Sequence, residues 1–290
     1  MGLRLKFNLV LLLVFVVGLC GTGYVSHTLL HRNAREEVFR NAGLMLETAM
    51  AIRKYTVDQV RPNLEAHAEG VFVPQSVPAY AATETVAELR KKYPDYSYKE
   101  ATLNPINPRN RVTDWEADLV QEFRNNLQAT ELYGERDTAT GRSLFIARPI
   151  QVKTEACLSC HSTPAAAPAA MVKQYGEVNG YGWKLNEIVG AQVVSVPMSL
   201  PIRNADRAFQ AFMISLITIF IIVFLFLNVM LSWLIIRPVS TMSHMAQQVS
   251  TGDFRIPEFD ERGKDEIAVL GNSFNRMRRS LQKAMKMIEG

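Results

Sequence analysis

The chain has 290 residues and carries 32 Lys and Arg against 28 Asp and Glu, a formal net charge of +4 at pH 7. This near balance does not indicate nucleic acid as a partner, because domains that bind nucleic acid concentrate positive charge. The apolar share of 48% is ordinary as a total, but much of it lies in two uncharged blocks. With three cysteines, a disulfide framework is excluded apart from a bridge within one closely spaced pair.

The first apolar block covers residues 7–25 and contains no charged side chain. A run of about 20 such residues is long enough to span a membrane. Arg4 and Lys6 precede the block, so the positive-inside rule places the N-terminus in the cytoplasm. A cleaved signal peptide would also begin in this way, but no Ala-x-Ala-like site follows. We predict a short cytoplasmic segment over residues 1–6 and an uncleaved transmembrane helix over residues 7–29.

The second apolar block covers residues 208–236, and its strongly polar side chains are Gln210 and Asn228. Its length exceeds what one membrane crossing requires, so we predict a second transmembrane helix there. With the N-terminus in the cytoplasm, two crossings place residues 30–207 outside the cytoplasm and residues 237–290 inside it.

A Cys-x-x-Cys-His pentapeptide lies in the outer segment as Cys157-Leu158-Ser159-Cys160-His161. Two thiols at this spacing can add to the two vinyl groups of haem, and the following histidine then reaches the iron. We therefore predict one covalently attached haem c on Cys157 and Cys160, with His161 as the proximal iron ligand. Bacterial c-type haem is attached outside the cytoplasmic membrane, which agrees with a periplasmic domain anchored in a bacterial inner membrane.

Two other uses of the pentapeptide are less favoured by the sequence. A structural zinc site requires four ligands, but the outer segment contains no second Cys or His pair, and its other histidines are His31 and His67. A thioredoxin-like redox pair would need a βαβ context, which the sequence does not indicate.

The ligand on the opposite side of the iron is left open by the sequence. Methionines commonly fill gaps in apolar cores, and a histidine after Arg61-Pro62 fits a solvated surface position equally well. An open or water-bound position is also compatible with the pattern. The candidate sixth ligands are His67, Met50, Met45, Met171 and Met198.

Hydrophobic spacing predicts an α+β outer domain with an antiparallel sheet. A long helix over residues 30–66 continues out of the membrane and is expected to end at Pro62. The other predicted elements are helices at 86–92 and 114–126 and strands at 131–133, 144–151 and 189–196.

Short motifs follow one another over most of residues 30–200. They are Ala51-Ile52-Arg53-Lys54-Tyr55-Thr56, Arg61-Pro62, Leu103-Asn104-Pro105-Ile106-Asn107-Pro108, Phe123, Ala147-Arg148-Pro149-Ile150, Cys157-Leu158-Ser159-Cys160-His161, Tyr175-Gly176, Gly180-Tyr181-Gly182-Trp183 and Glu187-Ile188-Val189-Gly190. In these motifs and in their order the outer segment resembles the Tll0287-like family of PAS-like haem domains. One departure is Asn186, where the family usually has Gly, but Asn tolerates positive φ better than most residues. The resemblance implies a PAS-like fold with haem near the sheet. Within it, the loop 180–183 has two compatible interpretations, a tight turn with core aromatics and a loop that brings Trp183 or Tyr181 against the porphyrin.

After Arg237-Pro238 the apolar residues follow a heptad pattern in two runs, separated by Thr251-Gly252-Asp253-Phe254. Two heptad helices joined by a connector, with Pro238, Asp265-Glu266 and Phe274-Asn275-x-Met277, resemble a HAMP domain over residues 237–290. Because one such pair cannot bury its apolar seam, a homodimeric four-helix bundle is implied. The predicted seam residues are Val239, Met242, Ala246, Val249, Ile267, Leu270, Phe274, Met277, Leu281, Ala284 and Ile288.

Together these features predict a haem-based transmembrane signal transducer that senses redox state or a diatomic gas. No catalytic motif is visible, so we expect no enzyme activity in this chain and a separate cytoplasmic output partner such as a kinase. One alternative is a membrane-anchored c-type cytochrome for electron transfer, although an electron carrier has no need of a HAMP segment. A truncated histidine kinase or chemoreceptor is another.

Overall fold

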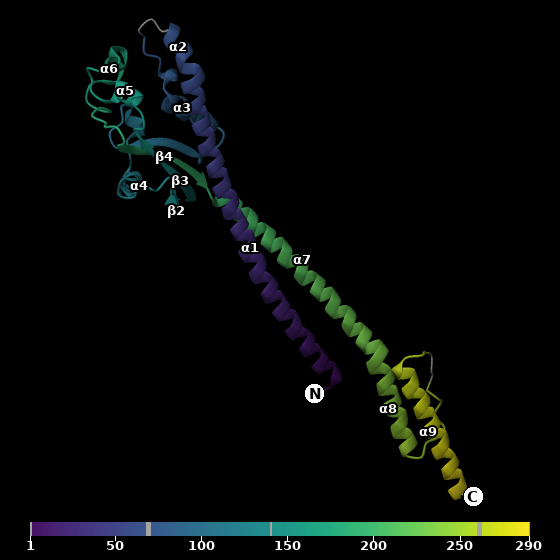
Figure 1. Cartoon of the computed structure of the whole chain (residues 1–290). Helices are drawn as coiled ribbons and strands as arrows, with labels where there is room; N and C mark the ends of the chain where they lie inside the picture. The colour runs from purple at the N-terminus through teal and green to yellow at the C-terminus, as the bar shows by residue number, and fades with distance from the viewer. Residues whose placement is uncertain (1, 68–70, 140, 260–262, 290) are drawn as a thin grey trace. The chain divides into compact units, whose positions relative to one another are not determined.

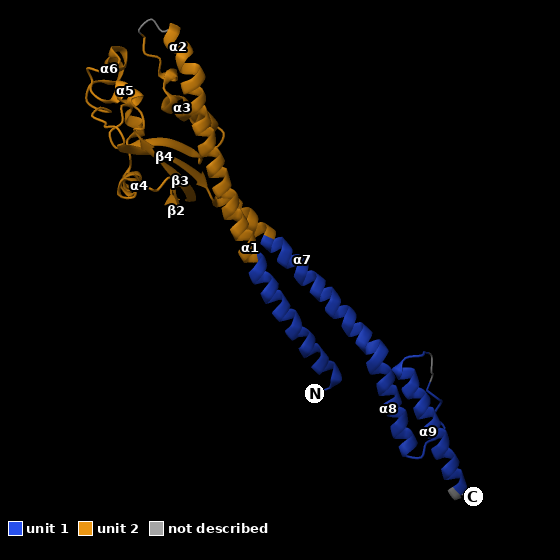
Figure 2. Cartoon of the chain, in the orientation of Figure 1, with its two compact units in different colours: residues 1–26, 209–290 blue, residues 27–208 orange. Residues whose placement is uncertain are grey.

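A computed structural model describes residues 2–67, 71–139, 141–259 and 263–289, except for the side chains of residues 288 and 289. The chain divides into two compact units (Figure 2). One contains residues 27–208, and the other contains residues 1–26 together with residues 209–290. Figure 1 gives the labels of the helices and strands.

A four-stranded antiparallel sheet forms the centre of the unit 27–208, in the order β1-β4-β3-β2. Strand β4 is buried at every position except its last, and its Val194 pairs with Tyr98 of β1 on one side and Ile146 of β3 on the other. The strands are β1 (Ser97–Thr102), β2 (Leu132–Thr138), β3 (Gly141–Gln151) and β4 (Ile188–Pro197). The three predicted strands are therefore confirmed in somewhat longer form, and β1 was not foreseen.

Strand β1 escaped prediction because Lys99 and Glu100 follow each other in it. Alternation places these two side chains on opposite faces of the sheet. Lys99 pairs with Glu116 at 2.6 Å on one face, and Glu100 pairs with Arg53 on the other. Because each charge is neutralised by a distant residue, the strand can be buried despite its polar sequence.

The long first helix does not end at Pro62, so that prediction is wrong. Helix α1 (Leu3–Tyr55) runs into a π-helical turn, η1 (Thr56–Val60), and then into α2 (Arg61–His67). In the π-turn the N–H of Arg61 donates to the carbonyl of Thr56. Pro62 follows as the second residue of α2, in the first turn of a helix, where a missing N–H is tolerated.

The remaining helices of this unit lie around the sheet and beyond its edge (Figure 1). The prediction of a helix over 114–126 is confirmed, and the helix predicted at 86–92 begins earlier, at Pro78, which fits a first turn. These elements are η2 (Pro74–Ser76), α3 (Pro78–Arg90), η3 (Pro108–Asn110), α4 (Asp114–Asn125), η4 (Glu155–Cys157), α5 (Leu158–His161) and α6 (Ala169–Tyr175).

Each face of the sheet carries its own apolar cluster. On β4, Val194 and Val196 point to one face and Ala191 and Val193 to the other, as the two-residue period requires. The α1 cluster comprises Val38, Ala42, Leu46, Ala49, Ala82, Val86, Tyr98, Leu144, Ile146, Val194, Val196 and Met198. The α4 cluster comprises Ala101, Val120, Phe123, Ala147, Ile188, Ala191 and Val193.

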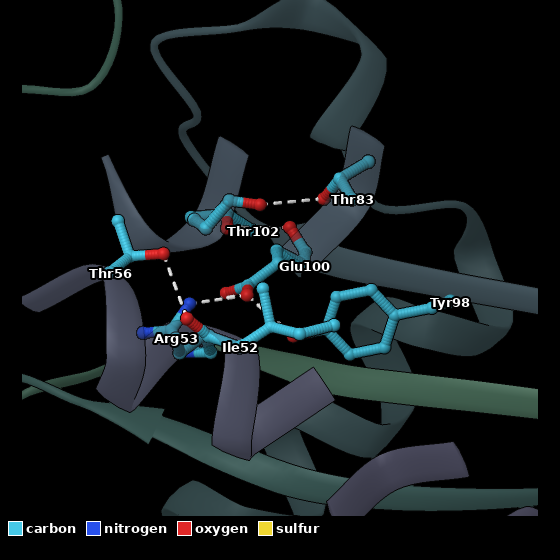
Figure 3. A network of polar contacts seen from close by, with 8 residues as sticks. Ile52, Arg53, Thr56, Thr83, Tyr98, Glu100 and Thr102 are labelled. Carbon is cyan, nitrogen blue, oxygen red and sulfur yellow. Dashed lines mark hydrogen bonds and ion pairs between the residues drawn. The ribbon is translucent and has the colours of Figure 1, made fainter. Parts of the chain in front are cut away.

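A buried polar network interrupts the α1 cluster (Figure 3). The guanidinium of Arg53, near the end of α1, pairs with Glu100, and the Tyr98 hydroxyl donates to Glu100 Oε1 at 2.5 Å. Burial and then the Glu100 charge raise the pKa of Tyr98. Burial lowers the pKa of Arg53, but Glu100 and Tyr98 outweigh it, so that pKa is raised. The raised pKa values keep the Tyr98 hydroxyl neutral and the Arg53 guanidinium charged.

In the second unit, α1 and α7 (Ser199–Leu231) supply the apolar blocks. Among the described residues, two helices are long and apolar enough to cross a membrane, Leu3–His67 and Ser199–Ser250, and their most apolar stretches have mean hydropathies of 2.3 and 2.9. The rings of Phe15 and Phe220 stack between them, with centroids 4.7 Å apart. In each helix's most apolar stretch only 6% of the residues are buried, unlike in a soluble core helix.

Two further helices follow the second block. A π-turn, η5 (Ser232–Ile236), leads into α8 (Arg237–Ser250), and α9 (Glu266–Glu289) follows a connector. Met245, Val249 and Phe274 form a small cluster against which Ile256 and Phe259 of the connector pack. The amide of Asn275 accepts from the N–H of Phe259 and donates to its carbonyl, both at 3.0 Å. The predicted helix–connector–helix segment is therefore confirmed.

Candidate functional site

The pentapeptide forms one tight helical turn. The 3-10 turn η4 ends at Cys157, and α5 continues from Leu158 to His161. Both Cys157 and Cys160 are free thiols of intermediate exposure. Residues three apart on a helix lie on the same face, so the turn presents both sulfurs to one side.

His161 is held in a single tautomer by the loop that follows. Its Nδ1 lies 2.7 Å from the carbonyl oxygen of Gly180, which can only accept, so Nδ1 carries the proton. Burial lowers the pKa of His161, although the Gly180 bond raises it. The ring is therefore neutral at pH 7, and among the described residues no hydrogen-bond donor meets the lone pair of Nε2. A second hydrogen bond of this kind is the usual support for a metal-ligating histidine.

The loop 180–183 also covers the face of this imidazole. The indole of Trp183 lies parallel to the His161 ring, with centroids 3.7 Å apart and an interplanar angle of 3°. The N–H of Gly182 donates to Ser162 O at 2.9 Å, and the N–H of Trp183 donates to His161 O at 3.2 Å. Trp183 thus stacks on the histidine itself, while the Tyr181 hydroxyl donates to Gly176 O at 3.0 Å.

Gly180 is required at its position. Its φ is +86°, and a Cβ there would lie 2.7 Å from the backbone nitrogen of Ile106. Sequence reasoning missed the Gly180 carbonyl as a partner of His161, because a backbone acceptor has no residue signature. The signal was the pair of glycines around Tyr181, which marks a loop of positive φ. Asn186 also has positive φ, +66°, so the Asn departure from the family pattern is accommodated.

The five candidate sixth ligands lie in different surroundings. Met198 is 2% exposed inside the α1 cluster, against which Met45 also packs. Met50 lies on the same helix, half-buried, and Met171 is buried on α6. His67 is exposed at the end of α2, with Nδ1 2.7 Å from Asn63 O. Within the described part of the chain, none of the five has a hydrogen bond or ring contact with His161, and the sixth ligand stays a prediction.

The donor set fits haem attachment. It consists of two free thiols on one side of a turn and one neutral imidazole with its Nε2 free. Among the described residues, no group of three or more His, Cys, Asp and Glu side chains is arranged to hold a metal ion directly. Haem needs only His161 as a protein ligand from this turn. The βαβ setting of a thioredoxin-like pair is not what surrounds it, since the paired strands are antiparallel.

Comparison with known proteins matches two family models to the chain. The model described as Tll0287-like matches residues 31–197, and the HAMP domain model matches residues 230–283. A solved structure, the cyanobacterial haem protein Tll0287, is similar at 17% identity and a TM-score of 0.43, covering 56% of this chain and 95% of that one. A search of curated proteins gave no match. The Tll0287-like match spans more than half of the chain, which therefore belongs to the Tll0287-like family and carries a HAMP domain after its second apolar helix.

Proposed function

We propose that this protein is a membrane signal transducer whose input is a haem c, covalently attached to Cys157 and Cys160 with His161 as the proximal iron ligand. The single observation that carries the proposal is His161, whose Nδ1 is bound by Gly180 and whose Nε2 is free, directly after the two thiols. The HAMP domain further along the same chain favours signalling over electron transfer.

The residues of the turn would have two different roles, attachment of the haem and binding of its iron. Cys157 and Cys160 would hold the haem as thioethers, and His161 would bind its iron through Nε2. When bound, the haem supplies reversible one-electron chemistry and an iron position for a small gas. The Gly180 carbonyl keeps the His161 proton on Nδ1, and it thereby keeps Nε2 a ligand rather than a donor.

The topology that we propose places the haem turn in the periplasm of a bacterium. Arg4 and Lys6 before the first apolar block favour a cytoplasmic N-terminus. The corresponding division is 1–6 cytoplasmic, 7–29 transmembrane, 30–207 periplasmic sensor, 208–236 transmembrane and 237–290 HAMP in the cytoplasm. The inner membrane is the compartment in which such an arrangement meets the c-type haem attachment machinery.

We further propose a homodimer that works through the HAMP helices. Val239, Leu270, Met277 and Leu281, all predicted seam residues, are each between 41% and 51% exposed in the single chain. A second copy would cover these side chains in a parallel four-helix bundle. A change at the haem would then repack this seam and reach a separate output protein such as a kinase.

Haem attachment is the direct test of the proposal. The full chain is produced in cells that carry the c-haem maturation machinery, and covalent haem is measured by mass spectrometry. Wild type is expected to carry one haem, and Cys157→Ser with Cys160→Ser to carry none. Cys20→Ser, which changes the remaining cysteine, is the matched control and should carry one haem. A double variant that kept its covalent haem would refute the attachment.

The nature of the stimulus has its own test. Absorption spectra of the haem-loaded full chain are recorded in the ferric and ferrous forms, with and without CO or NO. A five-coordinate ferrous haem that binds CO supports gas sensing. A six-coordinate haem that ignores both gases contradicts gas sensing and leaves redox sensing as the input.

A further inference from the structure

We propose that Trp183 is a positioning residue that fixes the plane of the His161 imidazole, so that the iron ligand has one orientation. The inference rests on the proposed haem site and names what controls it. It starts from the stacking of the two rings, at 3.7 Å and 3°.

A single hydrogen bond does not fix the plane of the His161 imidazole. The bond from His161 Nδ1 to Gly180 O fixes one point of the imidazole, but the ring can still pivot about the N–H···O line. An aromatic plane against the ring face blocks that pivot, because tilting either ring would lose contact or create a clash. Gly180 and Trp183 therefore supply two different constraints, one on the edge and one on the face.

The backbone on both sides of the indole is well anchored. The N–H of Trp183 donates to the carbonyl of His161, so the two residues are joined by both backbone and side chain. One residue further on, the N–H of Lys184 donates to Glu187, whose carboxylate also pairs with Arg124 of α4. Strand β4 begins directly afterwards, at Ile188. The backbone that carries the indole is thus tied to His161 and to the start of β4, which fixes the position from which the ring stacks on the imidazole.

A packing role alone predicts different behaviour, and Trp115 provides the comparison. Trp115 lies in the same unit, packs against the α4 cluster and has Phe145 at 5.4 Å and the Arg136 guanidinium at 4.0 Å. Its loss removes an indole of equal size from the domain without touching His161. A positioning role therefore requires that Trp183 changes alter His161 and that Trp115 changes do not.

The first arm uses the haem-free full chain in detergent, produced without the maturation machinery. The rate at which diethyl pyrocarbonate modifies His161 is measured by peptide mass spectrometry, with exposed His67 as internal reference. Trp183→Met is expected to raise the His161 rate about two- to tenfold, the range that corresponds to loss of one aromatic pair. Trp183→Phe should restore most of the protection, and Trp115→Met should leave the rate unchanged. An unchanged rate in Trp183→Met, or an equal rise in Trp115→Met, overturns the proposal.

Misfolding is detected within the same arm, because it would change the modification of other residues of the domain. If Trp183→Met misfolds, the proposal is tested with Trp183→Phe and Trp183→Tyr, which keep an aromatic ring at this position. The His161 rate in both is expected to lie within about twofold of wild type. A tenfold rise in either contradicts the proposal.

The second arm uses the haem-loaded full chain and measures the orientation of the iron ligand instead of the accessibility of His161. The electron paramagnetic resonance g-values of the ferric haem depend on the imidazole plane. They should shift in Trp183→Met, return toward wild type in Trp183→Phe and stay constant in Trp115→Met. Constant g-values in Trp183→Met overturn the inference while the haem site stands. If wild type carries no covalent haem, the proposed function fails, and the haem-free rates still decide the role of Trp183.

Discussion

The unit 27–208 holds two groups of buried or half-buried polar side chains that differ in how far they satisfy one another. In the network of Arg53, Glu100 and Tyr98, the two charges pair across 47 residues of the chain, and the Tyr98 hydroxyl donates to Glu100 within β1. At the turn Cys157–His161, the imidazole has one nitrogen bonded. Its two thiols form no disulfide, and their hydrogen-bond contacts are long, 3.6 Å to Thr154 and 3.8 Å to Ser159. The network is satisfied within the protein, whereas the turn carries the groups to which we propose that haem is attached.

Under the proposed function, this difference separates residues that specify the fold from residues that would bind a ligand. Charges that pair in the interior are costly to bury and costly to break, so they are sensitive to substitution. Groups that await a ligand have few partners to lose, so they should tolerate substitution until the ligand is required. The following predictions test that division, from the largest expected effect on the free energy of unfolding to the smallest.

Breaking the buried ion pair should have the largest effect. Arg53→Met leaves the Glu100 carboxylate, 3% exposed, without its cation, and we expect a loss of about 3–5 kcal/mol in the free energy of unfolding. Chemical denaturation of the haem-free full chain, followed by tryptophan fluorescence, measures it. Lys54→Met is the matched control, because its pair with Asp58 is exposed and worth about 0–1 kcal/mol. Equal losses in the two variants would remove the distinction between the two groups.

Gly180→Ala should have the second-largest effect on the free energy of unfolding. The new Cβ would meet the Ile106 backbone, in addition to the strain of a side chain at φ +86°, so we expect a loss of about 2–4 kcal/mol. The same denaturation experiment applies. Gly182→Ala, at φ +83° with nothing within 4 Å, carries the backbone strain alone and should lose about 1–2 kcal/mol. If Gly182→Ala cost as much, the close approach to Ile106 would not matter.

Tyr98→Phe should cost somewhat less. It removes a hydrogen bond to a charged carboxylate, for which we expect a loss of about 1.5–3 kcal/mol at pH 7. Tyr133→Phe, at a hydroxyl whose residue is 68% exposed, is the control and should lie within about 0.5 kcal/mol of wild type.

The same tyrosine gives a pH dependence with a definite sign. Because its pKa is raised in the folded protein, the folded state keeps a proton that the unfolded chain releases above tyrosine's ordinary pKa, about 10. The contribution of Tyr98 is therefore fully present below pH 10 and declines as the pH rises further. Denaturation at pH 7 and pH 11 should show wild type losing more stability than Tyr98→Phe. A constant difference between the two proteins would contradict the raised pKa.

The smallest effect is expected at the thiols. In the haem-free chain, Cys157→Ser with Cys160→Ser should change the free energy of unfolding by less than about 0.5 kcal/mol, since both side chains are partly exposed. Denaturation of the double variant beside wild type measures this difference. A loss of several kcal/mol would mean that the thiols stabilise the fold without haem.

Much of the fold followed from local pattern, and the exceptions depend on distant partners. The apolar blocks, the helix at 114–126 and three of the strands carry their periodicity in adjacent residues, as do the HAMP helices. Strand β1 has no such local periodicity. Its Glu100 can be buried because it pairs with Arg53, which lies 47 residues earlier. At the site, the pentapeptide was visible, but the stacking of Trp183 on His161 joins residues that only the tertiary structure brings together.

The two π-helical turns have a consequence for the angular phase of the helices. A turn of this kind acts as a one-residue insertion, and one residue of an α-helix corresponds to a rotation of about 100°. Thr56–Val60 and Ser232–Ile236 therefore offset the faces of α2 and α8 from the faces of the helices before them. Deleting one residue from Ser232–Ile236 would allow a continuous α-helix and rotate α8 by that angle. The one additional residue in this π-turn thus sets the direction in which the apolar face of α8 points.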